Sequence, residues 1–198
     1  MNCILISFIA FFVLISSSSG KAAQCTALKE DSSTQELLDF LRSSKELPQE
    51  KRDGECIDFA IRHLEHKPSP EAETLLIDYL GFERPLSQAE RAGFMLHGPI
   101  TESNTHPAMG TLLTFGKSAV PALLSSIEES PSEAFRGTAT HTLMLIFRDQ
   151  PPMGIEYLKQ RSTHAEPINA ARLKEAARTA IQWCGDKYKQ QCDAALAR

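Results

Sequence analysis

The feature that most constrains the fold is the stretch Leu112 to Ile146, in which apolar spacing and turn signals describe two short helices. Gly116 and Lys117 interrupt a preceding helical pattern, and Ser118 is placed to cap the next helix through its hydroxyl. Pro121 falls in a first helical turn, where its missing N–H removes no intrahelical hydrogen bond. Apolar residues then recur at helical spacing, at Val120, Leu123, Leu124 and Ile127.

A second helix in this stretch is predicted to start at Ser130-Pro131-Ser132-Glu133, which combines capping-box spacing with proline at the first helical position. It carries two apolar stripes, one of Phe135, Ala139, Thr142, Leu143 and Ile146, the other of His141, Met144 and Leu145. A helix that is apolar on two sides is normally packed between neighbours. We therefore predict that this helix lies inside a stack of helices.

The segment FGKSAVPALLSSIEESPSEAFRGTA resembles a HEAT-type helical repeat. The pattern of such repeats is filled by Gly116, Ala119, Val120, Pro121, Ala122, Leu123, Glu129, Pro131, Arg136 and Ala139. It departs at Gly137, Thr138, Thr140 and His141, where these repeats usually hold alanine or another helix former. The close match is limited to about residues 112–146. The resemblance implies a short right-handed α-solenoid of antiparallel helix pairs, but it implies little about function because such solenoids have many roles.

Residues 1–22 are predicted to be a cleaved secretory signal peptide. The run from Ile4 to Ile15 is almost wholly apolar but shorter than the about 20 residues that span a bilayer, and small residues follow it up to Ala22. No Lys or Arg precedes the run, which departs from the usual pattern. A lipoprotein site at Cys25 is a poorer alternative, because Gln24 occupies a position that expects a small residue.

Without that signal, residues 23–198 are expected to form a single α-helical repeat domain, located in the periplasm or outside the cell. Its remaining cysteines are Cys25, Cys56, Cys184 and Cys192, an even number that indicates disulfides in an exported chain. Of the three possible pairings we favour Cys25–Cys56 and Cys184–Cys192, since each ties a terminal segment to its neighbouring helix. A buried free thiol is the alternative for Cys184.

Further helices are predicted from capping signals at Ser33–Glu36, at Asp53 and at Ser69-Pro70. Residues 97–107 contain two prolines and a glycine without apolar periodicity, which predicts a loop between an N-terminal and a C-terminal half. The last long helix is predicted to start near Pro167. No strand-like alternation of useful length occurs, so the predicted class is all-α.

Few residues suggest chemistry. His63 and His66 lie three apart on a predicted helix and could share a metal, but no third ligand has a matching spacing. His141 could act as a general base near Thr138 or Thr142, although a core histidine with a hydrogen bond is the commoner arrangement. Trp183, the only tryptophan, could anchor a ligand or pack over a disulfide or turn. No catalytic motif is present, so we assign no catalytic, cofactor-binding or metal residue and expect no cofactor.

The net charge of −4 disfavours nucleic-acid binding, and no membrane span is expected after signal cleavage. The leading hypothesis is an exported, non-enzymatic interaction or scaffold module that binds another extracytoplasmic protein through the concave face of its repeats. One alternative is a small-ligand binder with a pocket between the two halves, near residues 97–107. The other is a hydrolase-type enzyme that uses His141 or His106 in an open cleft.

Overall fold

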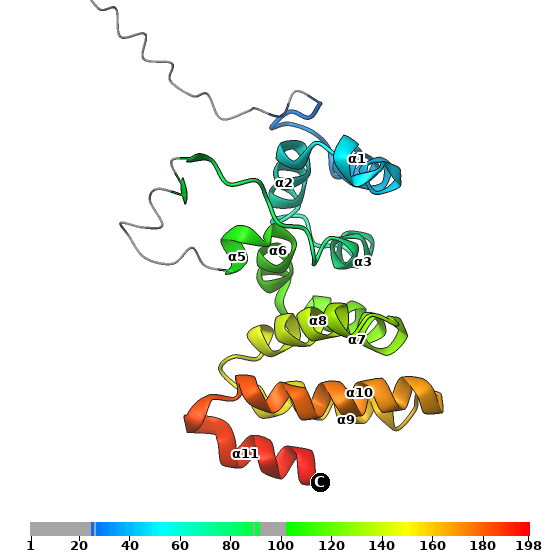
Figure 1. The fold of residues 1–198 in the computed structure, drawn as a ribbon, viewed down its shortest axis with the longest axis vertical. Coiled ribbons are helices and arrows are strands. Elements are labelled where there is room, and N and C mark those ends of the chain that lie inside the picture. Colours follow the sequence, from blue (N-terminus) through cyan, green and yellow to red (C-terminus); the bar gives the residue numbers. More distant parts are fainter. Residues whose placement is uncertain (1–24, 26, 89, 92–101) are drawn as a thin grey trace, which may run out of the picture.

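The structure, a computed structural model, describes residues 25, 27–88, 90–91 and 102–198, and these residues form helices with no strand among them (Figure 1). The predicted all-α class is therefore confirmed. The predicted signal peptide, residues 1–22, lies outside the described residues. Within the described ranges, no helix has both the length and the apolar character needed to cross a membrane.

The α-helices follow one another with short connections. In chain order they are α1 (Thr34–Glu46), α2 (Gly54–His63), α3 (Pro70–Asp78), α5 (Glu102–Thr105), α6 (Pro107–Phe115), α7 (Val120–Glu129), α8 (Glu133–Ile146), α9 (Pro151–Ser162), α10 (Pro167–Ala180) and α11 (Gly185–Ala197). Short 3₁₀ turns lie at Gln49–Lys51, Gly116–Ala119 and Ile181–Trp183.

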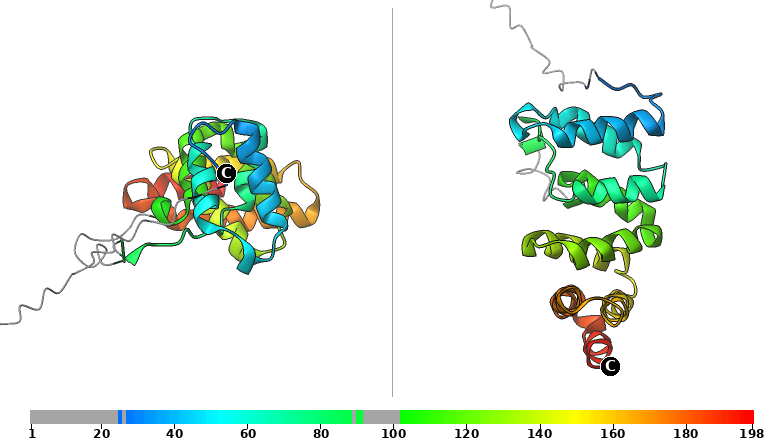
Figure 2. Two further views of the ribbon diagram at one scale, coloured as in Figure 1. Left: turned by 90° about the horizontal axis from the view of Figure 1, so that it is seen from above. Right: turned by 90° about the vertical axis from the view of Figure 1, so that its right-hand side faces the viewer.

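The helices stack in successive pairs along the long axis of the molecule (Figure 1). Helix α1 packs on α2, α3 on α6, α7 on α8 and α9 on α10. Between pairs, α3 contacts both α1 and α7, and α6 contacts both α2 and α8. The last pair is turned: in the right-hand view of Figure 2, α9 and α10 are seen nearly end-on while the earlier helices lie across the page. Helix α10 consequently contacts both α7 and α8, and α11 packs on α9.

One continuous apolar core runs through the stack. Its largest fully buried side chains are Leu37, Leu38, Leu41, Ile57, Ile61, Leu64, Leu76, Leu80, Leu112, Leu123, Ile127 and Leu143. Each such side chain contributes about 1.5–3 kcal/mol when it leaves water. Helix α8 contacts α6, α7, α9 and α10, which confirms its predicted place between neighbouring helices.

Several helices begin where their capping residues predict. Ser33 and Glu36 form a reciprocal capping box at the start of α1. The Asp53 carboxylate accepts a hydrogen bond from the Cys56 N–H (3.0 Å), and the Ser69 hydroxyl accepts one from the N–H of the third residue along, in α3 (3.1 Å). These side chains satisfy N–H groups that have no partner within the helix.

Two predicted helix starts are wrong by a few residues. Gly116, at φ 64°, ends α6 as predicted, but a 3₁₀ turn follows it and the Ser118 hydroxyl donates backward to the Phe115 carbonyl (3.1 Å). Helix α7 therefore begins without a side-chain cap. At α8 the capping hydroxyl belongs to Ser132, which accepts from the Phe135 N–H (3.3 Å), and not to Ser130.

The segment 97–107 is not a loop throughout. Residues 97–101 lie outside the described residues, 102–105 form the single turn α5, and Pro107 is the first residue of α6. A single helical turn needs no apolar stripe, so apolar periodicity cannot reveal it. The segment is the last part of the connection from α3 to α6, two helices that pack against each other.

The four cysteines of residues 25–198 form the two local disulfides favoured from the sequence. Cys25 bonds to Cys56 across 31 residues, and Cys184 bonds to Cys192 across 8 residues. The first ties the segment before α1 to the start of α2, and the second ties the end of the α10 region to α11. Cys184 is consequently not a free thiol.

Candidate functional site

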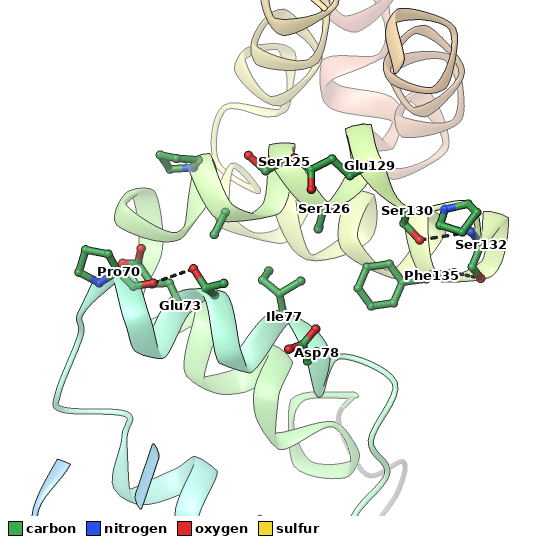
Figure 3. A pocket seen from close by; sticks show the side chains of 14 residues that line it. Pro70, Glu73, Ile77, Asp78, Ser125, Ser126, Glu129, Ser130, Ser132 and Phe135 are labelled. Carbon is green, nitrogen blue, oxygen red and sulfur yellow. Dashed lines mark hydrogen bonds between the residues drawn. The ribbon is translucent and has the colours of Figure 1, made fainter. Parts of the chain in front are cut away.

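An open groove of about 820 Å³ lies between α3 and α7, which belong to successive helix pairs (Figure 3). Helix α3 contributes one wall, helix α7 the other, and the turn between α7 and α8 closes one end. The lining residues are Pro70, Glu73, Thr74, Ile77, Asp78, Pro121, Ala122, Ser125, Ser126, Glu129, Ser130, Pro131, Ser132 and Phe135.

Helix α3 is held in place by contacts to α1. The Tyr79 hydroxyl, just after α3, donates a hydrogen bond to the Leu41 carbonyl, and burial raises the pKa of Tyr79 to about 12. Lys45 on α1 binds Asp78 at the end of α3, with 2.6 Å between Nζ and Oδ2. A buried hydrogen bond and a surface ion pair thus hold the C-terminal end of α3 on α1, and they set the position of one groove wall.

Two arginines hold the other wall where α7 ends. Arg172 Nη1 donates to the carbonyls of Glu128 (3.0 Å) and Glu129 (3.1 Å), and Arg136 Nη1 donates to those of Ser130 and Pro131 (3.1 Å each). The last carbonyls of a helix have no partner within it, and cationic side chains suit its negative end. The turn that closes the groove is thereby fixed by α8 and α10.

The apolar part of the groove comes from both walls. Ile77 is almost fully buried beneath it, Ala122 and Phe135 are half-buried, and Pro121 and Pro131 are exposed at its margin. Pro121 lies in the first turn of α7 and Pro131 in the turn before α8, so both present rigid rings at fixed positions. A partly exposed apolar surface of this kind, bordered by polar residues, is typical of a binding groove.

The charged residues of the groove all carry the same sign. Among the described residues, its lining contains the carboxylates of Glu73, Asp78 and Glu129 and no Lys, Arg or His. Figure 3 shows Glu73 and Asp78 on α3, with Glu129 on the facing α7. The groove is therefore an apolar surface with acidic groups, suited to a ligand that is both apolar and cationic.

The structure places the histidines considered from sequence away from this groove. His141 and Trp183 stack on each other, with ring centroids 4.9 Å apart, so the tryptophan packs on α8. His63 stacks on Phe59 at 3.8 Å. Among the described residues, no group of three or more His, Cys, Asp or Glu side chains is placed to hold a metal ion.

His106 precedes α6 and is half-buried, with an Nδ1 atom that has no hydrogen-bond partner among the described residues. Like His141, it does not line the groove. Beside the segment 97–107, a hollow of about 250 Å³ is lined by Arg62, Glu65, Asn104, Pro107, Gly110, Thr111, Leu113 and Thr114. That volume is below the roughly 300–1,000 Å³ typical of small-ligand pockets.

No protein-family model, no curated protein and no solved structure matches this chain. The sequence did not predict the α3–α7 groove as a binding site: its α7 and α8 residues, such as Pro121 and Phe135, entered only as parts of the helix pattern, and Glu73 and Ile77 of α3 were not considered. One signal was present: Ile77 lies off the main apolar stripe of α3 and shares a face with Pro70, Glu73 and Thr74, at helical spacing. An isolated apolar residue on a polar face does not by itself show that another helix will lie opposite.

Proposed function

We propose that this chain is an exported, non-enzymatic protein-interaction module, built as a short HEAT-like α-solenoid, that binds an extracytoplasmic partner in the α3–α7 groove. The observation that carries the proposal is the groove itself, which is open, partly apolar and formed between two stacked helix pairs. Grooves between helices commonly receive a segment of a partner protein.

The pairwise stacking supports the solenoid part of the proposal. Each of the first helix pairs contacts mainly the pairs beside it, as in repeat proteins, where each unit packs on its neighbours. The segment that resembles a HEAT repeat, residues 112–146, coincides with the end of α6 and with α7 and α8. The matched Pro121 and Pro131 both line the groove, so the resemblance and the proposed binding surface share residues.

The two disulfides support export. Disulfides persist in oxidising compartments and are rare in the cytosol, where thiols are kept reduced. The apolar segment within residues 1–22, followed by small residues, supplies the expected signal. We therefore propose that the partner is met in the periplasm or outside the cell.

The proposal narrows the binding surface expected from sequence, which was the whole concave face of the repeats. The groove is favoured because it combines a volume of about 820 Å³ with exposed apolar groups. A second hollow, of about 480 Å³, lies between α8 and α10, but the Arg136–Glu175 ion pair spans its lining (3.5 Å). This hollow is smaller, and two of its three charged residues, Arg136 and Glu175, are already paired with each other, so it offers less to a partner.

Site-directed photo-crosslinking tests this function. A photoreactive amino acid replaces Ser125, which lines the groove, and in a matched control it replaces Gln190, which is exposed on α11. In the cells that encode the protein, we expect the Ser125 form to give one discrete adduct with an extracytoplasmic protein and the Gln190 form to give none. No adduct at Ser125, or the same adducts at both positions, would refute the proposal.

A further inference from the structure

One carboxylate of the groove has no ion-pair partner. Glu73 is only 7% exposed as a residue, and its side chain makes no hydrogen bond or ion pair with any described residue. Glu128 is buried to a similar degree but binds Arg161, with 2.6 Å between Oε2 and Nε. The Glu73 carboxylate oxygens still reach solvent, so a cation that enters the groove can bind them, and the attraction strengthens as the ligand displaces water.

The position of Glu73 in its helix explains its residue type but not its burial. It lies in the first turn of α3, where the helix dipole favours an acidic side chain. An exposed glutamate would satisfy that preference equally well, as the exposed Glu71 does two residues earlier. Burial in the groove lining therefore needs a separate reason.

The other two carboxylates add negative charge to the groove instead of balancing Glu73. Asp78 is already paired with Lys45, and Glu129 is an exposed carboxylate on the opposite wall. None of the described residues that line the groove is basic. An occupant of the groove must therefore bring its own positive charge.

Two of the hydroxyl groups that line the groove donate to carbonyls of their own helices. Thr74 Oγ1 donates to the Pro70 carbonyl (2.8 Å), and Ser126 Oγ donates to the Leu123 carbonyl (2.8 Å). Their oxygen lone pairs remain as acceptors, and the three carboxylates of the lining also only accept. These acceptors favour a ligand that donates, and the side chains of Lys and Arg have donors only.

Among possible cationic ligands, the apolar surface of the groove favours a segment of a protein. The methylene stems of Lys and Arg pack on apolar groups while their charged ends reach a polar partner. Ile77 and Phe135 offer such a surface within the same groove as Glu73. A neighbouring apolar residue of the same segment would cover the exposed rings of Pro121 and Pro131.

We infer that the groove takes a segment of the partner protein that carries a Lys or Arg next to apolar residues, and that the cationic group binds Glu73. The inference rests on the proposed function and specifies its ligand. The methylene stem of that Lys or Arg and the apolar neighbours of the segment lie on Ile77 and Phe135. The N–H groups of the segment donate to the acceptor oxygens of the groove walls.

Binding of designed peptides to the purified chain, with its disulfides intact, tests the inference. The probes are three short, dye-labelled, end-blocked peptides: alternating Lys and Leu, alternating Glu and Leu, and alternating Lys and Ser. Fluorescence anisotropy gives the affinity, and NMR chemical-shift changes locate the site. We expect only the Lys–Leu peptide to bind well, with shifts around Thr74, Ser126 and Phe135.

The variant Glu73→Gln should weaken that binding about tenfold or more, because removal of one partner from a desolvated charge pair is costly. The matched control Glu50→Gln removes an exposed charge outside the groove and should leave the affinity unchanged. If Glu73→Gln fails to fold, as judged by its melting temperature, Glu129→Gln serves instead. That exposed carboxylate should contribute about two- to fivefold.

Three results would overturn the inference. They are unaltered binding by Glu73→Gln, equal binding of the Glu–Leu or Lys–Ser peptide, and absence of Lys–Leu binding. Glu73-dependent binding of spermidine alone, without peptide binding, would instead identify a small polyamine as occupant.

The crosslinking experiment distinguishes failure of the proposed function from failure of the inferred ligand. An adduct at Ser125 whose partner segment lacks Lys and Arg would leave the proposed function in place and refute the ligand. No adduct at Ser125 would refute the function, while the peptides would still report what the groove accepts.

Discussion

The two disulfides should differ in the stability that each contributes, by an amount set by their loop lengths. In the chain-entropy description, a crosslink stabilises the fold by restricting the unfolded chain, and the effect grows with the logarithm of the number of residues enclosed. Cys25–Cys56 encloses a span of 31 residues and Cys184–Cys192 one of 8. The expected contributions are about 3.7 kcal/mol and about 2.5 kcal/mol to the free energy of unfolding.

Two variants isolate these contributions. C184A/C192A retains only Cys25–Cys56, and C25A/C56A retains only Cys184–Cys192. Each is unfolded in urea with and without reductant, so that within one variant the covalent bond is the only change. The alanine substitutions are common to both conditions and do not affect the difference.

We expect reduction to lower the free energy of unfolding more in C184A/C192A, by about 1.2 kcal/mol, than in C25A/C56A. An equal loss in both variants, or a larger loss in C25A/C56A, would refute the entropic reasoning. Such a result would mean that contacts of the folded termini, and not the restriction of the unfolded chain, govern what each crosslink contributes.

Three further predictions concern stability. Hydrogen bonds from Arg84 and Ser87 lower the pKa of Glu90 to about 2, below its usual 4.5. The interaction of the Glu90 carboxylate with these residues therefore stabilises the fold above pH 4.5 and is lost as the pH falls towards 2. In urea titrations, the difference in unfolding free energy between wild type and Glu90→Gln should shrink over that pH range. Gly116→Ala should cost about 1–3 kcal/mol in the same assay, because φ is 64° there, whereas the control Gly81→Ala, with no neighbour within 4 Å of a new Cβ, should be neutral or slightly stabilising. Tyr79→Phe should cost about 1 kcal/mol by loss of its hydrogen bond to Leu41, measured by thermal unfolding, and no loss would show that this bond does not hold α3 on α1.

Much of the helical pattern could be predicted because its signals are local. Ser33, Asp53 and Ser69 cap their helices through hydrogen bonds to the N–H three residues later, so a few adjacent residues contain the whole interaction. The local disulfides were predictable for a related reason, since a short span keeps paired cysteines near each other in any compact arrangement.

The predicted starts of α7 and α8 were wrong where two local signals compete. Ser118 has a capping side chain, but the backbone before α7 is already helical at Ala119, and a cap needs an extended residue there. Ser130 and Ser132 are both extended, and the hydroxyl of Ser130 accepts from the N–H of Ser132 instead of starting the helix itself. The two serines lie two residues apart and compete for the same cap, and the Ser130 carbonyl also accepts a hydrogen bond from Arg136 Nη1 (3.1 Å).

The sequence by itself determined the helices and most of their starts, since these depend on interactions between residues close in the chain, and it favoured the observed cysteine pairing among three. Only the tertiary structure decided the groove. Glu73 and Phe135 are far apart in sequence and line the same groove because α3 packs on α7 of the adjacent helix pair. The spacing along one helix shows which residues share a face, but what lies opposite depends on the packing of the other helices. Glu73 is an ordinary first-turn glutamate in the sequence, and only the folded stack places it, mostly buried and without an ion-pair partner, in the lining of the groove.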